Sequence, residues 1–187
     1  MSRWEPNSRG RLEQAALELY RERGFDRTTV SDIAVRAGLT ERTFFRHFAD
    51  KREVLFGGQE QLREVLVGTI AEAAESATPL EIVAAAVVAV AEWMQEGRAH
   101  ALRRREVIVA NPSLQERELA KLLTLGSATA DALRARGVGD LEAILAAEIG
   151  VAVFRVAFER WLDDPSARDF AGHVREAFDH LRAVVDA

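Results

Sequence analysis

The 187-residue sequence contains no cysteine and no apolar segment long enough to cross a membrane. Without cysteine the chain forms no disulfide and offers no thiolate as a nucleophile or metal ligand, which suits the reducing cytoplasm. Its longest apolar run, from Ile82 to Ala91, is far shorter than the roughly 20 residues of a transmembrane helix. The first residues, MSRWEPNSRGRLEQ, lack the apolar core of a signal peptide. We therefore expect a cytoplasmic protein with no membrane partner.

The charged residues are unevenly distributed along the chain, whose net charge is −5. Residues 1–56 hold 11 of the 25 lysines and arginines but only 9 of the 30 acidic residues, which gives this part a charge of +2 and leaves −7 for the rest. Attraction to phosphate acts locally and is screened beyond roughly 8 to 10 Å. The acidic net charge therefore does not exclude nucleic acid as a partner of the amino-terminal part.

Apolar residues recur with helical spacing through most of the chain, and no alternating strand pattern competes with them. Their share of 48% is ample for a core. Start signals such as Thr78-Pro79 and Asn111-Pro112 divide the helices. We expect an all-α protein of about nine helices, two of them short and the others at 8–23, 51–75, 79–96, 98–110, 112–136, 140–162 and 166–185.

The two short helices lie within residues 28–51 and are separated by a glycine turn. Thr29 and Asp32 have the spacing of a capping box at the start of the first helix, Gly38 supplies its end, and Thr40 caps the second. The apolar face of the first helix comprises Val30, Ile33, Ala34 and Ala37. This arrangement is typical of a helix-turn-helix.

The second short helix has a polar and an apolar side. The polar side carries Arg42, Thr43 and Arg46, and the apolar side carries Phe44, Phe45 and Phe48. Such a helix could anchor itself in a core and present polar groups to the major groove of DNA. From the spacing alone, a corner between two helices with solvated arginines remains an alternative.

The segment from Arg9 to Phe56 resembles the amino-terminal domain of the TetR family of transcriptional regulators. The motifs that carry the resemblance keep the family's order and spacing: Gly24-Phe25, Thr28-Thr29, Ile33-Ala34, Ala37-Gly38, Thr43, Phe44-Phe45, His47-Phe48 and Lys51. The resemblance implies a DNA-binding domain at 1–56 and a helical ligand-binding and dimerisation domain at 57–187. It also implies a homodimer formed by the last two helices, here 140–162 and 166–185.

With the resemblance, the residue types predict which side chains contact DNA: Thr29, Thr40, Arg42, Thr43, Phe45, Arg46, His47 and Lys51. Lys51 is expected at a phosphate, and His47 either at a second phosphate or packed at the helix end. A dimer would present two such helices to half-sites about one helical turn apart, so we expect a pseudo-palindromic operator in double-stranded DNA. Release of a repressor by a small molecule is the mode of action that the family implies.

Two residues depart from the family pattern. Phe45 stands where members usually have a tyrosine whose hydroxyl reaches a phosphate, so it can pack but cannot donate. Arg42 stands where many members have glycine, and a guanidinium could bind guanine bidentately. The alternatives for Arg42 are a phosphate contact or an ion pair with Glu41 or Asp50.

An effector pocket is expected in the carboxy-terminal helices, with no other cofactor. Glu148 and Arg155 lie seven residues apart on a strongly apolar helix, where a charge needs a partner or a ligand. They could equally be surface, interface or ion-pair residues. Four apolar residues could line the pocket or form plain core: Trp93, Met94, Phe154 and Phe158.

One alternative function uses the last helix. His173, Glu176 and His180 share a face with a spacing that could bind a metal in an all-α enzyme or metal protein. We expect this face to be solvated and find no further ligands, nucleophile motif or phosphate loop in the sequence. The sequence therefore predicts no metal site and no enzyme.

Overall fold

The computed structural model describes residues 7–166 and 169–185, and in these residues all regular structure is helical. This confirms the all-α prediction. The chain forms two compact units: unit 1 comprises Met1–Gly58 and Leu102–Glu118, and unit 2 comprises Gln59–Ala101 and Leu119–Ala187. Helices α6 (Arg98–Val109) and α7 (Pro112–Ala135) each contribute residues to both units. A functional boundary between residues 56 and 57 stays a prediction.

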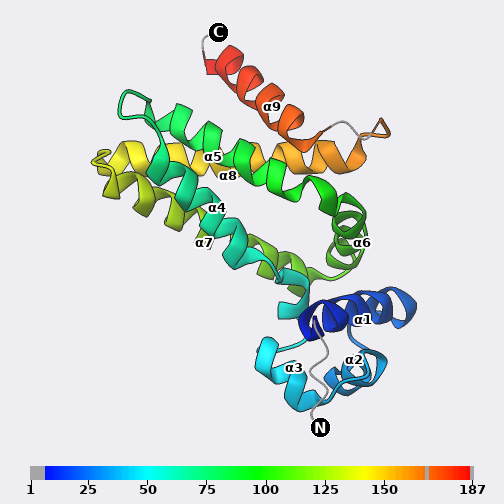
Figure 1. Ribbon diagram of the computed structural model, residues 1–187. Coiled ribbons are helices and arrows are strands. Elements are labelled where there is room, and N and C mark those ends of the chain that lie inside the picture. Colours follow the sequence, from blue (N-terminus) through cyan, green and yellow to red (C-terminus); the bar gives the residue numbers. More distant parts are fainter. Residues whose placement is uncertain (1–6, 167–168, 186–187) are drawn as a thin grey trace. The chain divides into compact units, whose positions relative to one another are not determined.

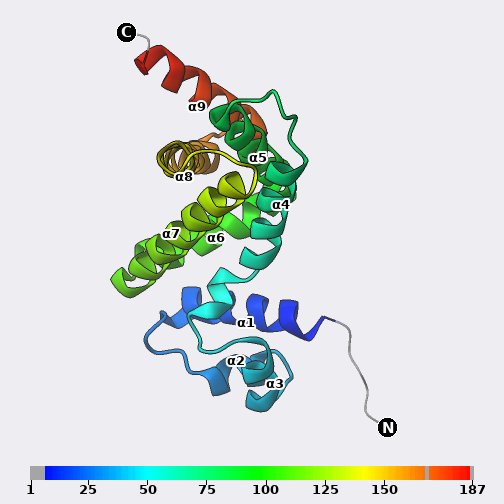
Figure 2. The same cartoon turned by 90° about the vertical axis from the view of Figure 1, so that its left-hand side faces the viewer.

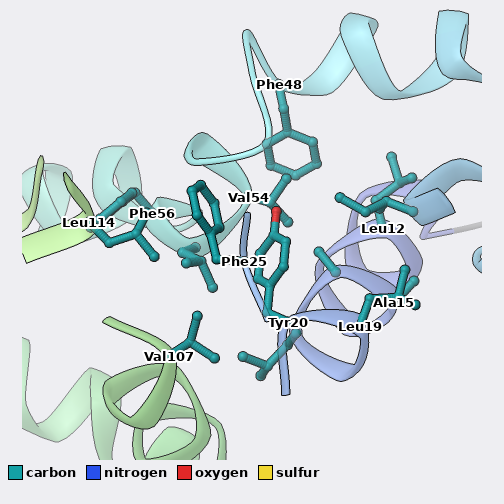
Figure 3. Packing of buried hydrophobic residues seen from close by; sticks show 14 of the residues in the cluster. Leu12, Ala15, Leu19, Tyr20, Phe25, Phe48, Val54, Phe56, Val107 and Leu114 are labelled. Carbon is teal, nitrogen blue, oxygen red and sulfur yellow. The ribbon is translucent and has the colours of Figure 1, made fainter. Parts of the chain in front are cut away.

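Unit 1 contains α1 (Ser8–Arg23), α2 (Val30–Arg36), α3 (Glu41–His47) and the 3-10 helix η1 (Glu53–Phe56), together with the parts of α6 and α7 named above. Its core is one apolar cluster, part of which is shown in Figure 3. The cluster joins α1 to the helix-turn-helix, and α6 and α7 add three buried residues to it: Val107, Ile108 and Leu114.

The helix predicted at 51–75 is interrupted in the structure. Residues Glu53–Phe56 form the 3-10 helix η1, and α4 begins only at Gln59 and ends at Glu72. Gly58, at φ 84°, breaks the helix between them because this backbone conformation favours glycine. The break allows Val54, Leu55 and Phe56 to turn into the core of unit 1.

Unit 2 contains α4, α5 (Pro79–Met94), most of α7, α8 (Asp140–Asp163) and α9 (Phe170–Val185). Helix α5 packs against α4, α8 and α9, and Figures 1 and 2 show it among these three helices. Thr78 and Glu81 form a complete capping box at its start. Burial of α5 on several sides explains why its sequence is apolar almost all round.

The end of α8 is held by a buried polar and aromatic cluster. Arg98 donates to the carbonyls of Trp161, Leu162 and Asp164 at 3.2, 3.0 and 2.7 Å, which satisfies carbonyl groups left open at the end of the helix. The rings of Trp161 and Phe170 stack with centroids 4.7 Å apart. The last helix begins at Phe170 and not at the predicted residue 166, while residues 167–168 lie outside the described part of the chain.

None of the helices in the described ranges combines the length and apolar character that crossing a membrane requires.

Candidate DNA-binding site and effector cavity

The helix-turn-helix is fixed by capping groups at both of its helices. Thr29 accepts a hydrogen bond from the backbone N–H of Asp32 at 3.1 Å, and the Asp32 carboxylate accepts from the N–H and the hydroxyl of Thr29. Gly38 follows α2 at φ 65°, and Thr40 then accepts from the N–H of Thr43 at 3.2 Å. The structure therefore contains the capped helices and the turn that the local sequence predicts.

Helix α3 is anchored through one side and open on the other. Phe44 is fully buried and contacts Phe48, also buried, with ring centroids 5.5 Å apart. The opposite side exposes Arg42, Phe45 and Arg46 to solvent. This division agrees with the recognition-helix interpretation, with the exception that Phe45 lies on the exposed side rather than in the core.

The guanidinium groups of Arg42 and Arg46 are available to a ligand. Within residues 7–166 and 169–185, neither group forms an ion pair. The carboxylate of Asp50, one of the two partners considered for Arg42, pairs with Arg52 at 2.7 Å. Because the two arginines are four residues apart, they project from one face of α3.

Phe45 is 55% exposed and meets Phe44 edge-to-face with centroids 5.4 Å apart. The ring is exposed together with Arg42 and Arg46. It has no polar group with which to donate to a phosphate oxygen.

Lys51 has a structural role that the sequence did not indicate. Its ammonium donates to the carbonyls of Phe25, Asp26 and Thr28 at 2.8, 3.3 and 2.9 Å. Its own carbonyl accepts from the hydroxyl of Tyr20 at 2.6 Å. All three N–H groups of the ammonium are thus used, and the phosphate contact predicted for Lys51 stays a prediction.

His47, at the end of α3, is half-buried and its Nε2 lies 2.9 Å from the hydroxyl of Ser8. Burial, and then the nearby charges of Arg46 and Arg9, lower the pKa of His47 below its usual 6.5. The neutral form of the ring is therefore favoured at pH 7. The ring lies 6.3 Å from that of Phe48 between centroids, and a phosphate contact stays a prediction.

Unit 2 contains a small apolar cavity between α4, α5, α7 and α8. Its volume is about 10 Å³, roughly the space of a single water. The hydroxyl of Thr129 is the one polar side-chain group among the lining residues, and it donates to the carbonyl of Leu125 at 2.8 Å. The lining residues are Leu66, Val83, Val87, Val90, Leu125, Thr129, Ala147, Gly150, Val151 and Phe154.

Of the residues predicted to bind the effector, Phe154 lines this cavity. Phe158 stacks on Phe154 with centroids 5.9 Å apart and belongs to the aromatic cluster at the end of α8. Trp93 is 47% exposed and Met94 is half-buried. Glu148 and Arg155 are both exposed on α8. The structure thus does not bring the six predicted residues together.

The three residues considered for a metal site do not form one. His173 is buried, contrary to the expected solvation of this face, because its Nε2 bonds to the carboxylate of Asp164 at 3.1 Å. Glu176 pairs with Arg160 at 3.1 Å and lies 3.8 Å from Nε2 of exposed His180. The described residues contain no cluster of three potential metal-binding side chains.

An exposed recognition helix on a helical core defines a DNA-binding protein of the helix-turn-helix class. Residues 13–57 match the model for bacterial regulatory proteins of the tetR family, and residues 77–186 match the MftR C-terminal domain. The chain belongs to the TetR family of transcriptional regulators. The family resemblance predicted from the sequence is therefore confirmed.

Two relatives with described functions are similar to this chain. The regulator TcmR of Streptomyces glaucescens is 33% identical over 90 residues, which span 48% of this chain and 40% of TcmR. The chain is 25% identical over 178 residues to a protein of Mycobacterium tuberculosis described as a mycofactocin biosynthesis transcriptional regulator, MftR, covering 94% of this chain and 89% of that protein.

Solved structures show the same fold. FadR of Bacillus subtilis, in complex with stearoyl-CoA, superposes with a TM-score of 0.62 at 19% identity, covering 91% of this chain and 95% of FadR. FadR of Thermus thermophilus, a repressor in complex with lauroyl-CoA, gives 0.53 at 26% identity and covers 91% of both chains.

Proposed function

We propose that the protein is a homodimeric repressor that binds a pseudo-palindromic operator through α3 and is released by a small-molecule effector with an apolar acyl chain. The observation that carries the DNA-binding part is the pair of exposed, unpaired guanidiniums of Arg42 and Arg46. They project from a helix that buried Phe44 and Phe48 hold rigidly. A cytoplasmic location follows from this role.

The proposed DNA contacts divide into two kinds. Arg42 reads a guanine in the major groove, because its guanidinium is free and suits a bidentate contact. Arg46 and the hydroxyls of Thr29, Thr40 and Thr43 position the helix on phosphates. Lys51 acts mainly through its hydrogen bonds to backbone carbonyls and His47 through packing, and Phe45 contributes apolar contact.

The proposed effector contains an unbranched acyl chain. The cavity of unit 2 is lined by aliphatic side chains and one phenyl ring, and its hydroxyl, from Thr129, is already bonded to Leu125. Such a lining favours hydrocarbon and offers no free polar group. The structurally similar FadR of Thermus thermophilus is in complex with lauroyl-CoA. Because the cavity of about 10 Å³ holds no ligand of this size, binding requires α5, α7 and α8 to separate.

The proposed homodimer uses α8 and α9, the helices that correspond to predicted segments 140–162 and 166–185. Helix α8 exposes four large apolar residues along its length, namely Leu141, Ile144, Leu145 and Val156. A solitary chain would leave these side chains in water, and a second copy would cover them. Two copies are also what a palindromic operator needs.

Selection of bound sequences from a random duplex pool tests the proposal, with the enriched site then titrated at two salt concentrations. Recovery of a pseudo-palindrome whose binding weakens steeply with salt is expected. No enrichment, with or without added effector, would contradict the DNA-binding role.

The effector is tested by release of the protein from the selected duplex. Lauroyl-CoA and stearoyl-CoA are added in parallel with free coenzyme A as the control. We expect release by an acyl-CoA and none by coenzyme A alone, because only the acyl chain matches the lining. Equal release by all three would contradict an acyl effector while leaving the DNA-binding role intact.

A further inference from the structure

The outward face of α8 is a mixed surface with a regular arrangement. Leu141, Leu145, Glu148, Ala152 and Arg155 are all exposed and follow one another at spacings of three and four residues. On an α-helix this spacing places them in one straight stripe. The stripe begins with two leucines and ends with a small residue, Ala152, between one negative and one positive charge.

Neither charge has a partner in the described ranges. Glu148 and Arg155 form no ion pair there, and both side chains are exposed. They are seven residues apart, which is about 10 Å along the helix, so they share a face without meeting each other. An ion pair within one chain, one of the alternatives from the sequence, is therefore not formed.

Helix α9 offers a different kind of surface. Its exposed side carries Arg175, Asp179, His180 and Arg182, and its exposed large apolar residues are Val184 and Val185 at its end. This side is polar over most of its length. In the proposed homodimer, α9 therefore supplies mainly polar contacts, with apolar contact at its end.

Helix α7 also carries exposed apolar residues. Leu119 and Leu123 are 53% and 68% exposed and lie on the same stripe of α7 as Gly126. Gly126 faces α8, since a Cβ placed there would lie 3.4 Å from the side chain of Val151 and 3.7 Å from a carboxylate oxygen of Glu148. Along this stripe of α7, Gly126 contacts α8, and the two exposed leucines precede it in the sequence.

We propose that a second copy of the chain docks on this surface with its α8 antiparallel to the first, crossing at Ala152. This inference rests on the proposed homodimer and specifies its register. A two-fold axis beside residue 152 places Glu148 of each subunit opposite Arg155 of the partner subunit, which makes two equivalent ion pairs. Ala152 allows the helices to approach closely, and Leu119 and Leu123 of α7 cover the flank.

The charges also select the direction of the pairing. In a parallel arrangement each Glu148 would face Glu148 of the partner subunit, and each Arg155 would face its own copy. Like charges opposed in this way disfavour association, whereas the antiparallel arrangement satisfies all four groups. The two charges of the stripe are therefore complementary to those of a second copy in the antiparallel orientation.

Charge reversal tests the register. The variants Glu148→Arg and Arg155→Glu should each raise the dimer dissociation constant about tenfold or more, because each places two pairs of like charges together. The double variant should restore dimerisation, as measured by analytical ultracentrifugation at several concentrations. Glu72→Arg, an exposed position at the end of α4, changes the net charge equally and should have no effect. Failure of the double variant to restore the dimer would overturn the proposal.

A cysteine cross-link gives a second measurement on the folded protein. Because the chain has no cysteine, Ala152→Cys introduces a single thiol at the proposed crossing. Mild oxidation should yield a covalent dimer, and Glu72→Cys should not. A wild-type protein that is dimeric but neither cross-links at 152 nor responds to charge reversal would overturn this register while leaving the proposed function standing. A protein that is monomeric at all concentrations, and on its operator, would instead overturn the homodimer itself.

Discussion

The ammonium of Lys51 lies 4.3 Å from the centroid of the Phe25 ring and donates a hydrogen bond to the carbonyl of the same residue at 2.8 Å. One side chain thus contacts both the face of a core ring and the backbone that carries it. The ring in turn meets Tyr20 at 5.2 Å between centroids, and Figure 3 shows both rings in the core of unit 1. Lys51 therefore ties the segment after α3 to the turn before α2.

We expect Lys51→Met to destabilise the protein by about 2 kcal/mol, because it removes charge-assisted bonds to carbonyls that then lose their donor. The slope of the logarithm of DNA affinity against that of salt concentration should stay the same. Thermal unfolding and a salt titration measure the two effects. Arg52→Met, at an exposed residue paired with Asp50, is the control for loss of a neighbouring charge. A slope reduced by about one unit would show instead that Lys51 contacts a phosphate.

Replacing Arg42 with alanine should cost about 1 to 3 kcal/mol of binding and relax the preference at one base of each half-site. Arg46→Ala should weaken binding to all sequences alike, because we assign its guanidinium to phosphate. Binding to the selected site and to its single-base variants separates the two effects. Arg63→Ala removes an arginine that is already paired with Glu60 on α4 and should change neither. Identical behaviour of the Arg42 and Arg46 variants would contradict base reading by Arg42.

Phe45→Tyr should tighten DNA binding by about 0.5 to 1.5 kcal/mol, the net value of one new hydrogen bond. The ring is 55% exposed, so the added hydroxyl meets no core atoms and stability should not change. Affinity for the selected duplex and the unfolding temperature are the two measurements. An unaltered affinity would mean that this ring contacts no phosphate.

The pH dependence of stability should contain a contribution from His47. Its folded pKa lies below the usual 6.5, through burial first and then Arg46 and Arg9. As the pH falls below 6.5 the unfolded chain takes up the proton first, so the free energy of unfolding declines until the folded pKa is reached. The variant His47→Gln should lack this decline in denaturant titrations at several pH values. His180→Gln, at an exposed position, should retain it.

Local signals in the sequence predicted the helix-turn-helix well. In each of the caps at Thr29, Thr40 and Thr78, the threonine bonds to a residue three positions later in the chain. These bonds are local, so the sequence alone predicts them without knowledge of the rest of the fold. Gly58 is a further local signal, and it interrupts the single helix predicted for residues 51–75. Its positive φ is the reason that α4 begins after residue 58.

The effector cavity could not be predicted in the same way. Periodicity indicates that α5 and α8 are apolar on several sides, but it does not tell which apolar residue faces a gap and which faces close-packed neighbours. Trp93 and Phe154 both fit the apolar periodicity, yet Trp93 is about half exposed whereas Phe154 lines the cavity. The burial of His173 could not be predicted for a similar reason, since it depends on a contact with Asp164, nine residues earlier in the chain.

The close approach of α5 and α8 yields a prediction about unit 2. A Cβ on Gly150 would lie only 2.4 Å from a methyl carbon of Val83, and both residues line the cavity. Gly150→Ala should therefore destabilise the protein by about 1 to 3 kcal/mol through overpacking, although alanine is the better helix former. Val83→Ala alone should also destabilise it, by leaving a void.

Together the two substitutions should interact favourably, because the methyl group added on α8 occupies space vacated on α5. A double-mutant cycle measured by denaturant unfolding gives the coupling free energy, which we expect to be about 1 kcal/mol or more in favour of the double variant. Gly68→Ala on α4, where an added Cβ meets nothing within 4 Å, is the control for the intrinsic helix preference. Additive effects at 150 and 83 would mean that the two helices move apart easily. In that case α5 and α8 could separate to admit an effector at little cost in free energy.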